Sequence, residues 1–203
     1  MNLLEGLTPE TLAARGLQWE HPAKWTALPQ RGLRVVVPPK TDYFRDPTGE
    51  KVKDNGPYLW RQVSGDFVAR LHMRPTFTGP YDAGGILVRH DEEQWAKLCF
   101  ESTDFGTTAA VSVVTRSLSD DANGVDLTVS DLWLQVCRAG EAFGMQYSLD
   151  GVVWRMVRQF RLPLPQMVRV GLLAQSPGDT GTCVDFAWFS VESRTVADTR
   201  AGA

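Results

Sequence analysis

Short hydrophobic stretches alternate with turn-forming residues along most of the chain. Val, Phe and Trp are frequent in the apolar stretches, and Gly, Pro, Asn and Asp gather between them, which is the pattern of antiparallel β-structure. We predict strands at residues 17–20, 33–37, 58–63, 66–73, 83–90, 94–101, 109–116, 132–139, 142–148, 154–160, 167–174 and 183–191. So many short strands, joined by brief turns, exclude a parallel βαβ sheet.

One short helix is predicted, close to the N-terminus. Thr8 can cap its first turn, Pro9 suits the first helical position, and Gly16 can end it. No second stretch of the chain shows comparable start and stop signals. The fold class that follows is all-β, with a single short N-terminal helix.

Two of the predicted connections are sharp, and the domain limits follow from where the apolar residues stop. Asp91–Glu93 joins one pair of strands, and Asp150–Gly151 favours a hairpin because glycine tolerates a positive φ. We predict one domain over 1–203, with a core from about 17 to 191. The tail 194–203 contains few apolar residues, so we expect it to be frayed.

Strand periodicity predicts a polar face on the sheet, because alternate residues of a strand point to opposite sides. In 94–101, alternate apolar residues should face the core, whereas Trp95, Lys97 and Glu101 should face away from it. Neighbouring strands would add Arg89, Ser112 and Arg116 to that face. The residues that we expect to bind a ligand there are Trp60, Asp82, Arg89, Trp95, Lys97, Glu101 and Arg116, with Trp60 and Asp82 at the rim.

Charge and cysteine content narrow the choice of partners and compartment. The formal net charge is −3 and both signs are mixed along the 203 residues, so no basic block predicts nucleic-acid binding. The N-terminal residues contain early acidic side chains and no long apolar run, which is typical of neither a secretory signal nor a membrane span. The three widely spaced cysteines, Cys99, Cys137 and Cys183, suit reduced buried thiols, so we expect a cytoplasmic protein.

Several motifs follow one another in an order that carries a family resemblance. They are Pro22–Trp25, Thr41–Phe44, Asp54–Trp60, Gly65–Phe67, Tyr81–Arg89, Trp95–Leu98, Glu101, Ser112–Arg116 and Ser119–Asp120. This succession, from about Leu17 to Val191, resembles an uncharacterised concanavalin A-like family often labelled "regulation of enolase protein". The resemblance implies a jelly-roll sandwich of two antiparallel sheets. It brings no established reaction and no settled catalytic residues.

The chain departs from that family's pattern at two motifs. Tyr43 and Phe44 follow Asp42 where the family favours Phe-Trp, and Pro57-Tyr58 follows Gly56 where His-Phe is usual. If that histidine serves a site in other members, the site here is altered. The wider fold includes lectins, glycan-binding modules and glycosidases, so saccharide binding on a concave sheet is an expectation by analogy of fold.

Charged residues on the predicted face allow more than one interpretation. Lys97 and Glu101 lie four residues apart on one strand, about 13 Å, so each should meet a charge from a neighbouring strand, such as Arg89 or Arg116. A structural ladder of ion pairs is one interpretation, and a cluster that binds hydroxyl or carboxylate groups is the other. Arginine forks favour carboxylates, so a sugar acid would fit.

Catalytic and metal chemistry have weaker support. Retaining glycosidases need two carboxyl groups about 5–5.5 Å apart, and Glu101 is the one carboxylate well inside a predicted strand of the candidate face. The three histidines lack ligand spacing, so we predict no metal and no cofactor. The acidic segment Asp120–Asp126 has oxygen ligands suitable for calcium, although a solvated turn is the favoured interpretation.

The leading hypothesis is therefore a small carbohydrate or sugar acid bound on the concave face. Trp95, expected to be exposed, would stack on a sugar ring; Lys97 and Arg89 would donate hydrogen bonds, and Glu101 would accept them. One alternative is a sugar-active enzyme, of hydrolase or lyase type, with Glu101 as acid or base. Another is a regulatory protein-interaction module. The sequence leaves monomer and homodimer equally open.

Overall fold

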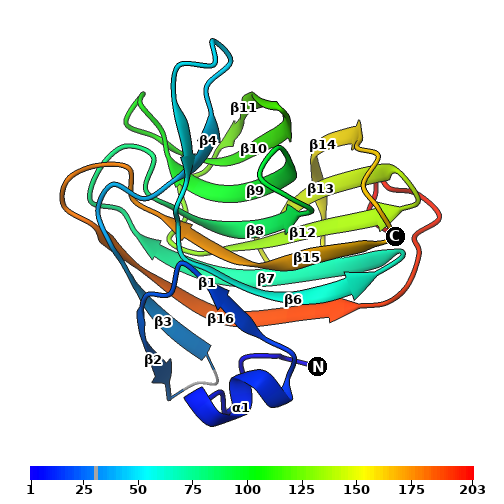
Figure 1. Cartoon of the computed structure of the whole chain (residues 1–203), viewed down its shortest axis with the longest axis horizontal. Helices are drawn as coiled ribbons and strands as arrows, with labels where there is room; N and C mark the ends of the chain where they lie inside the picture. Colours follow the sequence, from blue (N-terminus) through cyan, green and yellow to red (C-terminus); the bar gives the residue numbers. More distant parts are fainter. Residues whose placement is uncertain (30–31) are drawn as a thin grey trace.

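The computed structural model describes residues 1–29 and 32–203, and they form two seven-stranded antiparallel sheets packed face to face (Figure 1). A two-stranded hairpin, β4 (Tyr43–Arg45) and β5 (Val52–Asp54), forms a small sheet of its own. The helix α1 (Pro9–Ala14) lies near the N-terminus. The predicted all-β sandwich with one short helix is therefore confirmed.

Sheet A carries the predicted ligand-binding face. Its order is β1 (Gln18–Glu20), β6 (Tyr58–Ser64), β15 (Met167–Gln175), β8 (Ala83–Arg89), β9 (Gln94–Ser102), β10 (Thr108–Arg116) and β11 (Leu118–Asp126). Only β8–β9–β10–β11 are neighbours both in sequence and in space, and they form a meander. The strands β1, β6 and β15 reach the sheet from distant parts of the chain.

Sheet B closes the other side of the core. Its order is β14 (Arg155–Arg161), β13 (Ala142–Ser148), β12 (Leu132–Ala139), β7 (Phe67–Thr76), β16 (Thr182–Glu192), β3 (Gly32–Val37) and β2 (Lys24–Leu28). The chain crosses from one sheet to the other several times, although β8–β11 and β12–β14 each stay within one sheet. Such non-local pairing is typical of β-sandwiches.

Alternating apolar residues from both sheets fill the space between them. Leu98 and Phe100 of β9 are fully buried there, as are Phe189 of β16 and the ring pair Phe67–Phe143. Each large apolar side chain buried in this way contributes about 1.5–3 kcal/mol to stability. The opposite residues of β9 therefore face out of the sandwich, as the periodicity predicts.

Every predicted strand is present, but four further strands escaped prediction: β2, β4, β5 and β11. The most instructive is β11, because the acidic segment Asp120–Asp126 is not a loop. It is an edge strand that pairs with β10, with Val113 opposite Asp121. Charged residues on an edge strand discourage pairing with other chains, so the acidic composition has a structural explanation.

The ends of the chain are well packed. Thr8 caps α1 in a capping box with Thr11, as the sequence signals predict. The expected fraying of 194–203 is wrong, because these residues lie against the outer side of sheet B. Thr199 O accepts a hydrogen bond from Gln146 Nε2 at 2.8 Å, and Val196 is buried.

Candidate functional site

The outer face of sheet A is the face that points away from the core. Strand register places Leu87, Lys97, Val113 and Asp121 in one row across β8, β9, β10 and β11. Arg89 and Trp95 form part of the next row on one side. On the other side the row of Gly85 and Cys99 comes first, and Ala83 and Glu101 belong to the row beyond it. Arg89, Trp95, Lys97 and Glu101 therefore do share a face.

An apolar layer covers the middle of this face. Tyr43 of β4 packs edge-on against Trp95, with ring centroids 6.2 Å apart, and both side chains are fully buried. Tyr58 and Leu173 complete the layer. The hairpin β4–β5 lies over the sheet strands at this point, as Figure 1 shows. The prediction of an exposed, sugar-stacking Trp95 is wrong, because the hairpin seals it.

Arg89 is committed to an ion cluster at one end of the face. Its guanidinium and that of Arg169 bind the two carboxylate oxygens of Glu20, which lies on β1. Arg89 Nε also donates to Asp91 O at 2.9 Å, and its Nη2 lies 3.8 Å from Asp54 of β5. These contacts fasten β1 and the hairpin to the sheet, and they do not bring Arg89 to Glu101.

Trp60 and Asp82 occupy structural positions rather than an open rim. The guanidinium of Arg169 lies over the half-buried ring of Trp60, 5.5 Å from its centroid. Asp82 is buried and accepts hydrogen bonds from Thr78 N at 2.8 Å and from Ser176 Oγ at 2.6 Å. Asp82 therefore shapes the turn that leads into β8.

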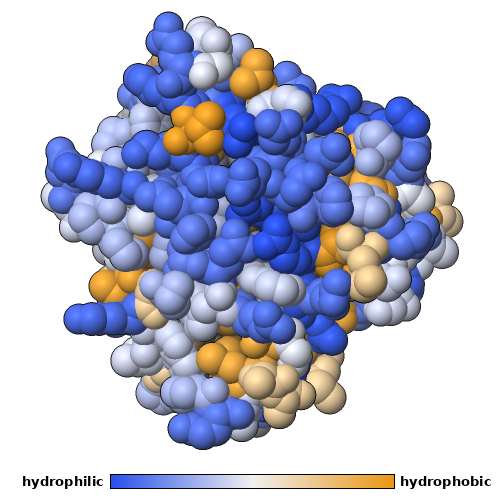
Figure 2. Space-filling view, in the orientation of Figure 1, coloured by the Kyte–Doolittle hydropathy of each residue, from blue (hydrophilic) through white to orange (hydrophobic). Residues whose placement is uncertain are grey.

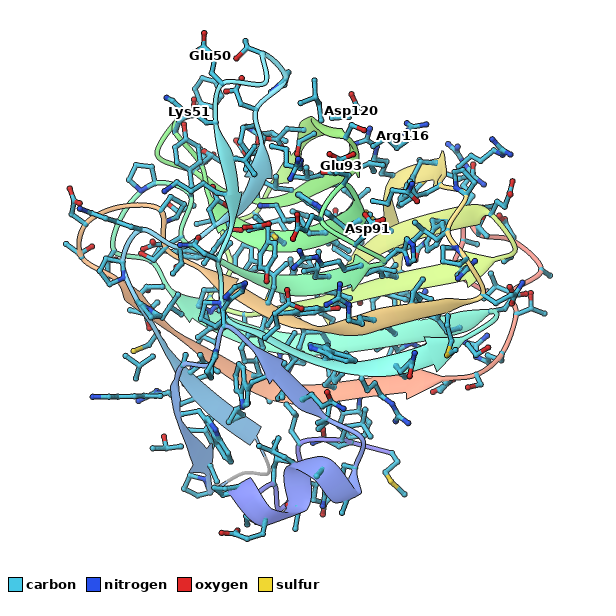
Figure 3. All side chains as sticks on the ribbon, in the orientation of Figure 1. Glu50, Lys51, Asp91, Glu93, Arg116 and Asp120 are labelled. Atoms are coloured by element: carbon cyan, nitrogen blue, oxygen red, sulfur yellow. The ribbon has the colours of Figure 1, made fainter. Side chains whose placement is uncertain are left out.

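Arg116 does not belong to the outer face at all. It lies opposite Gln94 in the pairing of β9 with β10. It therefore belongs with the alternate residues, such as Ala96, that are on the core side of the sheet. Its side chain is exposed at the end of β10, and its guanidinium lies 3.6 Å from the carboxylate of Asp120. The two residues are neighbours in Figure 3. Ser112 is also on the core side, opposite Leu98. The expectation that these two residues join Lys97 is wrong.

A second polar group surrounds Lys97, and we call it the Lys97 cluster: Asp42, Lys97, Glu101, Asp121 and Gln175. Lys97 Nζ donates to Gln175 Oε1 at 2.8 Å and lies 3.4 Å from Asp42 Oδ1. Gln175 Nε2 donates in turn to Glu101 Oε2 at 3.5 Å. The amide of Gln175 thus links the lysine and the glutamate, which do not touch each other.

The electrostatics of the Lys97 cluster favour a proton on Glu101. Burial raises the pKa of Glu101 to about 8; Lys97 opposes this rise, and Asp121, Asp42 and Asp104 add to it. Burial is the largest single influence on Lys97 and lowers its pKa, but Asp42, Cys99, Glu101 and Asp121 together outweigh burial and the pKa is raised. Asp121 lies at the solvent-exposed edge, yet enough protein surrounds its carboxylate to raise its pKa as well.

One oxygen of Glu101 accepts no hydrogen bond from the described residues. The residue is only 6% exposed. Among residues 1–29 and 32–203, Gln175 alone donates a hydrogen bond to its carboxyl group, and it does so to Oε2. Oε1 is not among the buried side-chain atoms without a partner, which in the described residues are Trp19 Nε1 and Tyr43 Oη. It therefore keeps some contact with solvent and is free to accept a hydrogen bond from a ligand.

Exposed aromatic residues lie near the same end of the face. Tyr81 is 45% exposed, and the charges of Asp104, Glu101 and Asp121 contribute to raising its pKa. Its backbone is held by Gln175 Nε2, which donates to Tyr81 O at 3.1 Å. Phe105, in the turn after β9, is 79% exposed. The side of the molecule drawn in Figure 2 is mainly hydrophilic, with a few separate apolar patches.

The described residues give no support for a metal centre or a membrane span. Within 1–29 and 32–203, no three His, Cys, Asp or Glu side chains are grouped so that they could hold a metal ion. In the same residues, no helix has the length and apolar character needed to cross a bilayer.

Comparison with known proteins gives the family. The model of a family described as "Protein of unknown function (DUF1349)" matches residues 19–194, which include the whole Lys97 cluster. The chain belongs to the DUF1349 family. The resemblance expected from the ordered motifs is confirmed.

Two relatives of this DUF1349 protein come from Saccharomyces cerevisiae. The chain is 30% identical to "Regulation of enolase protein 1" over 153 residues, 75% of this chain and 77% of that protein. It is 26% identical to a crystal structure described as a functionally unknown yeast protein, with a TM-score of 0.83 over 89% of this chain and 98% of that one. At 13% identity, carbohydrate binding module CBM66 from Bacillus subtilis shares the fold, with a TM-score of 0.56 over 88% of this chain and 96% of the module.

Three members of the Lys97 cluster in this DUF1349 protein escaped prediction from sequence: Asp42, Asp121 and Gln175. Asp42 had a usable signal, because it belongs to the motif Thr41–Phe44. Asp121 was assigned to a loop, so its face could not be derived. Gln175 ends β15 with no distinguishing pattern, and only the register opposite Ala83 brings it to this face.

Proposed function

We propose that this protein binds a small carbohydrate at the Lys97 cluster, on the outer face of sheet A. The observation that carries the proposal is Glu101 Oε1, an oxygen of a nearly buried carboxyl group without a donor from the described protein. A sugar hydroxyl can donate a hydrogen bond to Oε1 in place of solvent.

The neighbouring groups suit a polyhydroxylated ligand. Lys97 supplies N–H donors, Asp121 supplies an acceptor at the solvent-exposed edge, and the exposed ring of Tyr81 offers an apolar surface. Ligand sites commonly combine a few well-placed polar groups with an aromatic side chain. The carbohydrate binding module with the same fold supports the proposal only at the level of architecture, because function depends on the site.

A melting and calorimetry series tests the proposal. The folded protein is titrated with common neutral monosaccharides and disaccharides and their amine-bearing counterparts, and a binding sugar present at 100 times its Kd adds about 2.7 kcal/mol of stability. We expect Glu101→Gln to weaken binding. The matched control is Glu141→Gln, whose carboxylate lies at the start of β13 in an exposed pair with Arg161. If no saccharide raises the melting temperature of the unaltered protein, the proposal fails.

A second candidate function is a sugar-active enzyme with Glu101 as general acid. The observation that favours it is the pKa of Glu101 of about 8, since the carboxyl group then carries a transferable proton at neutral pH. Asp121 would act as the second carboxylate. The test is hydrolysis of aryl glycosides: turnover that is lost in Glu101→Gln and in Asp121→Asn supports this function. Turnover that is absent, or unchanged in both variants, rejects it.

A further inference from the structure

Three of the four strands at the edges of the two large sheets resist pairing with another chain. The edge strand β11 contains three aspartates, and the edge strand β14 contains three arginines. The edge strand β1 is only three residues long. Charged side chains and short length both discourage association from edge to edge.

The fourth edge strand, β2, carries no charge beyond its first residue. Its sequence is Lys24-Trp25-Thr26-Ala27-Leu28. One side of β2 pairs with β3. Among residues 1–29 and 32–203, its backbone makes no hydrogen bond on the other side. The free donors and acceptors of β2 are therefore available to a further strand.

An open groove lies along the same edge. Residues 7–9, where α1 begins, line one wall of the groove, and residues 23–27 line the other. Figure 1 shows α1 and β2 at the same end of the molecule. Ala27 lies opposite the core residue Leu33 in the pairing with β3, yet Ala27 is exposed. The inner side of sheet B is thus uncovered at this edge, and apolar side chains from a neighbouring strand would be buried there.

The strand β2 is complementary to itself when two copies meet antiparallel about a two-fold axis at Thr26. Trp25 of one copy then lies opposite Ala27 of the other, so a large side chain meets a small one on the groove side. Thr26 meets Thr26, which is a favourable cross-strand pair. Lys24 meets Leu28, so the two lysines stay at opposite ends of the pair. All five residues of β2 find a partner in this register.

We propose that β2 pairs with β2 of a second copy in this register, which makes the protein a homodimer. The two B sheets join into one continuous sheet, and Trp25 of each copy covers Ala27 of the other. Because each copy offers the same edge, the contact closes on itself and does not propagate into fibres. The inference is independent of carbohydrate binding, since the Lys97 cluster lies on sheet A.

Sedimentation equilibrium of the unaltered protein, from about 5 to about 200 µM, measures the association. We expect a mass twice the 22.5 kDa of one chain at the upper concentration. Thr26→Lys places like charges opposite each other in the middle of the pair and should weaken association at least about tenfold. Thr128→Lys is the matched control, because Thr128 is also an exposed threonine, in the segment before β12, and this change should leave the mass unaltered.

A disulfide tests the register as well as the edge. Directly opposed residues of an antiparallel pair have Cα atoms about 4.5–5.5 Å apart, which a disulfide can span. Thr26→Cys, oxidised with glutathione disulfide, should therefore give a covalent dimer, and each new bond releases two molecules of reduced glutathione. Thr128→Cys, treated in the same way, should remain a single chain on a non-reducing gel. This pair of variants decides the matter even if Thr26→Lys fails to fold.

Three results would each overturn the inference. They are a mass of one chain at about 200 µM, a dimer that Thr26→Lys leaves intact, and equal yields of covalent dimer from the two cysteine variants. A protein that stays monomeric would leave the edge of β2 to an extended segment of another protein. None of these results bears on sugar binding at the Lys97 cluster, so the two proposals succeed or fail separately.

Discussion

Lys97 Nζ lies 3.4 Å from Asp42 Oδ1, and this pair joins the middle of β9 to the segment that leads into the hairpin β4–β5. Asp42 Oδ1 also accepts a hydrogen bond from Tyr43 N at 2.7 Å. Tyr43 in turn covers Trp95. The Lys97 cluster is therefore a candidate ligand site, and its contacts also hold the hairpin against sheet A.

Replacing Lys97 should weaken the attachment of the hairpin to sheet A. Lys97→Met leaves the partly buried carboxylate of Asp42 without its cation, and breaking a pair that involves a fully buried lysine costs about 3 kcal/mol. We expect a loss of that size in the free energy of unfolding, measured with urea. Lys51→Met is the control, because Lys51 is exposed in the turn of the same hairpin (Figure 3) and should change stability by less than about 0.5 kcal/mol. Equal effects of the two substitutions would show that the pair of Lys97 and Asp42 does not hold the hairpin.

Glu101 should make the stability of the protein depend on pH. Its pKa is about 8 in the folded protein against an ordinary value of 4.5. Between these values the folded state holds a proton that the unfolded state has released, so the free energy of unfolding falls as pH rises. The slope is at most about 1.4 kcal/mol per pH unit, the value for one proton.

Urea titrations between about pH 5 and pH 8 measure this slope. The stability contributed by the protonated carboxyl is fully present below the unfolded pKa and is lost as pH rises through the folded pKa. Glu101→Gln, which cannot ionise, should flatten the curve and gain stability relative to the unaltered protein as pH rises. Parallel curves for the two proteins would show that Glu101 ionises as an ordinary glutamate.

Two buried tyrosines of the same apolar layer should respond differently to loss of the hydroxyl. Tyr43 Oη is buried without a hydrogen-bond partner in the described structure, whereas Tyr58 Oη donates to Leu87 O at 3.1 Å. Tyr43→Phe should therefore be neutral or slightly stabilising, and Tyr58→Phe should cost about 1 kcal/mol. Chemical unfolding of the two variants decides. A larger loss for Tyr43→Phe would mean that its hydroxyl has a partner such as an ordered water.

Period-two alternation predicted the strands and, within β9, the side chains that leave the core. These predictions are correct because successive side chains of one strand point alternately to the two faces of the sheet. Arg116 shows the limit. Lys97 lies opposite Val113, which faces out of the sandwich, whereas Arg116 belongs to the alternate residues of β10 that face the core. The register between two strands decides this, and it is set by the whole sheet.

The burial of Trp95 was beyond local reasoning for a different reason. Its cover comes from Tyr43, which lies on the hairpin β4–β5, and neither strand of that hairpin was predicted. Each of these strands has three residues, too short to show a period. The Lys97 cluster likewise depends on contacts between distant segments, since Gln175 follows Lys97 by 78 positions.

The docked C-terminal tail gives the last prediction. Gly202 adopts φ 76°, and a Cβ placed there would come within 2.2 Å of Gln135 Nε2. Gly49 has a similar φ of 81°, but a Cβ added there would meet no atom within 4 Å, so Gly49→Ala reproduces the backbone strain without the clash. Gly202→Ala should therefore detach the tail, whereas Gly49→Ala should leave it in place. Arg194 and Arg200 are exposed while the tail is docked, but trypsin cleaves a segment faster once it is locally unfolded. We therefore expect release of the tail, followed by mass spectrometry, to be about tenfold faster in Gly202→Ala. Equal release from both variants and the unaltered protein would show that the tail does not depend on its contacts with sheet B.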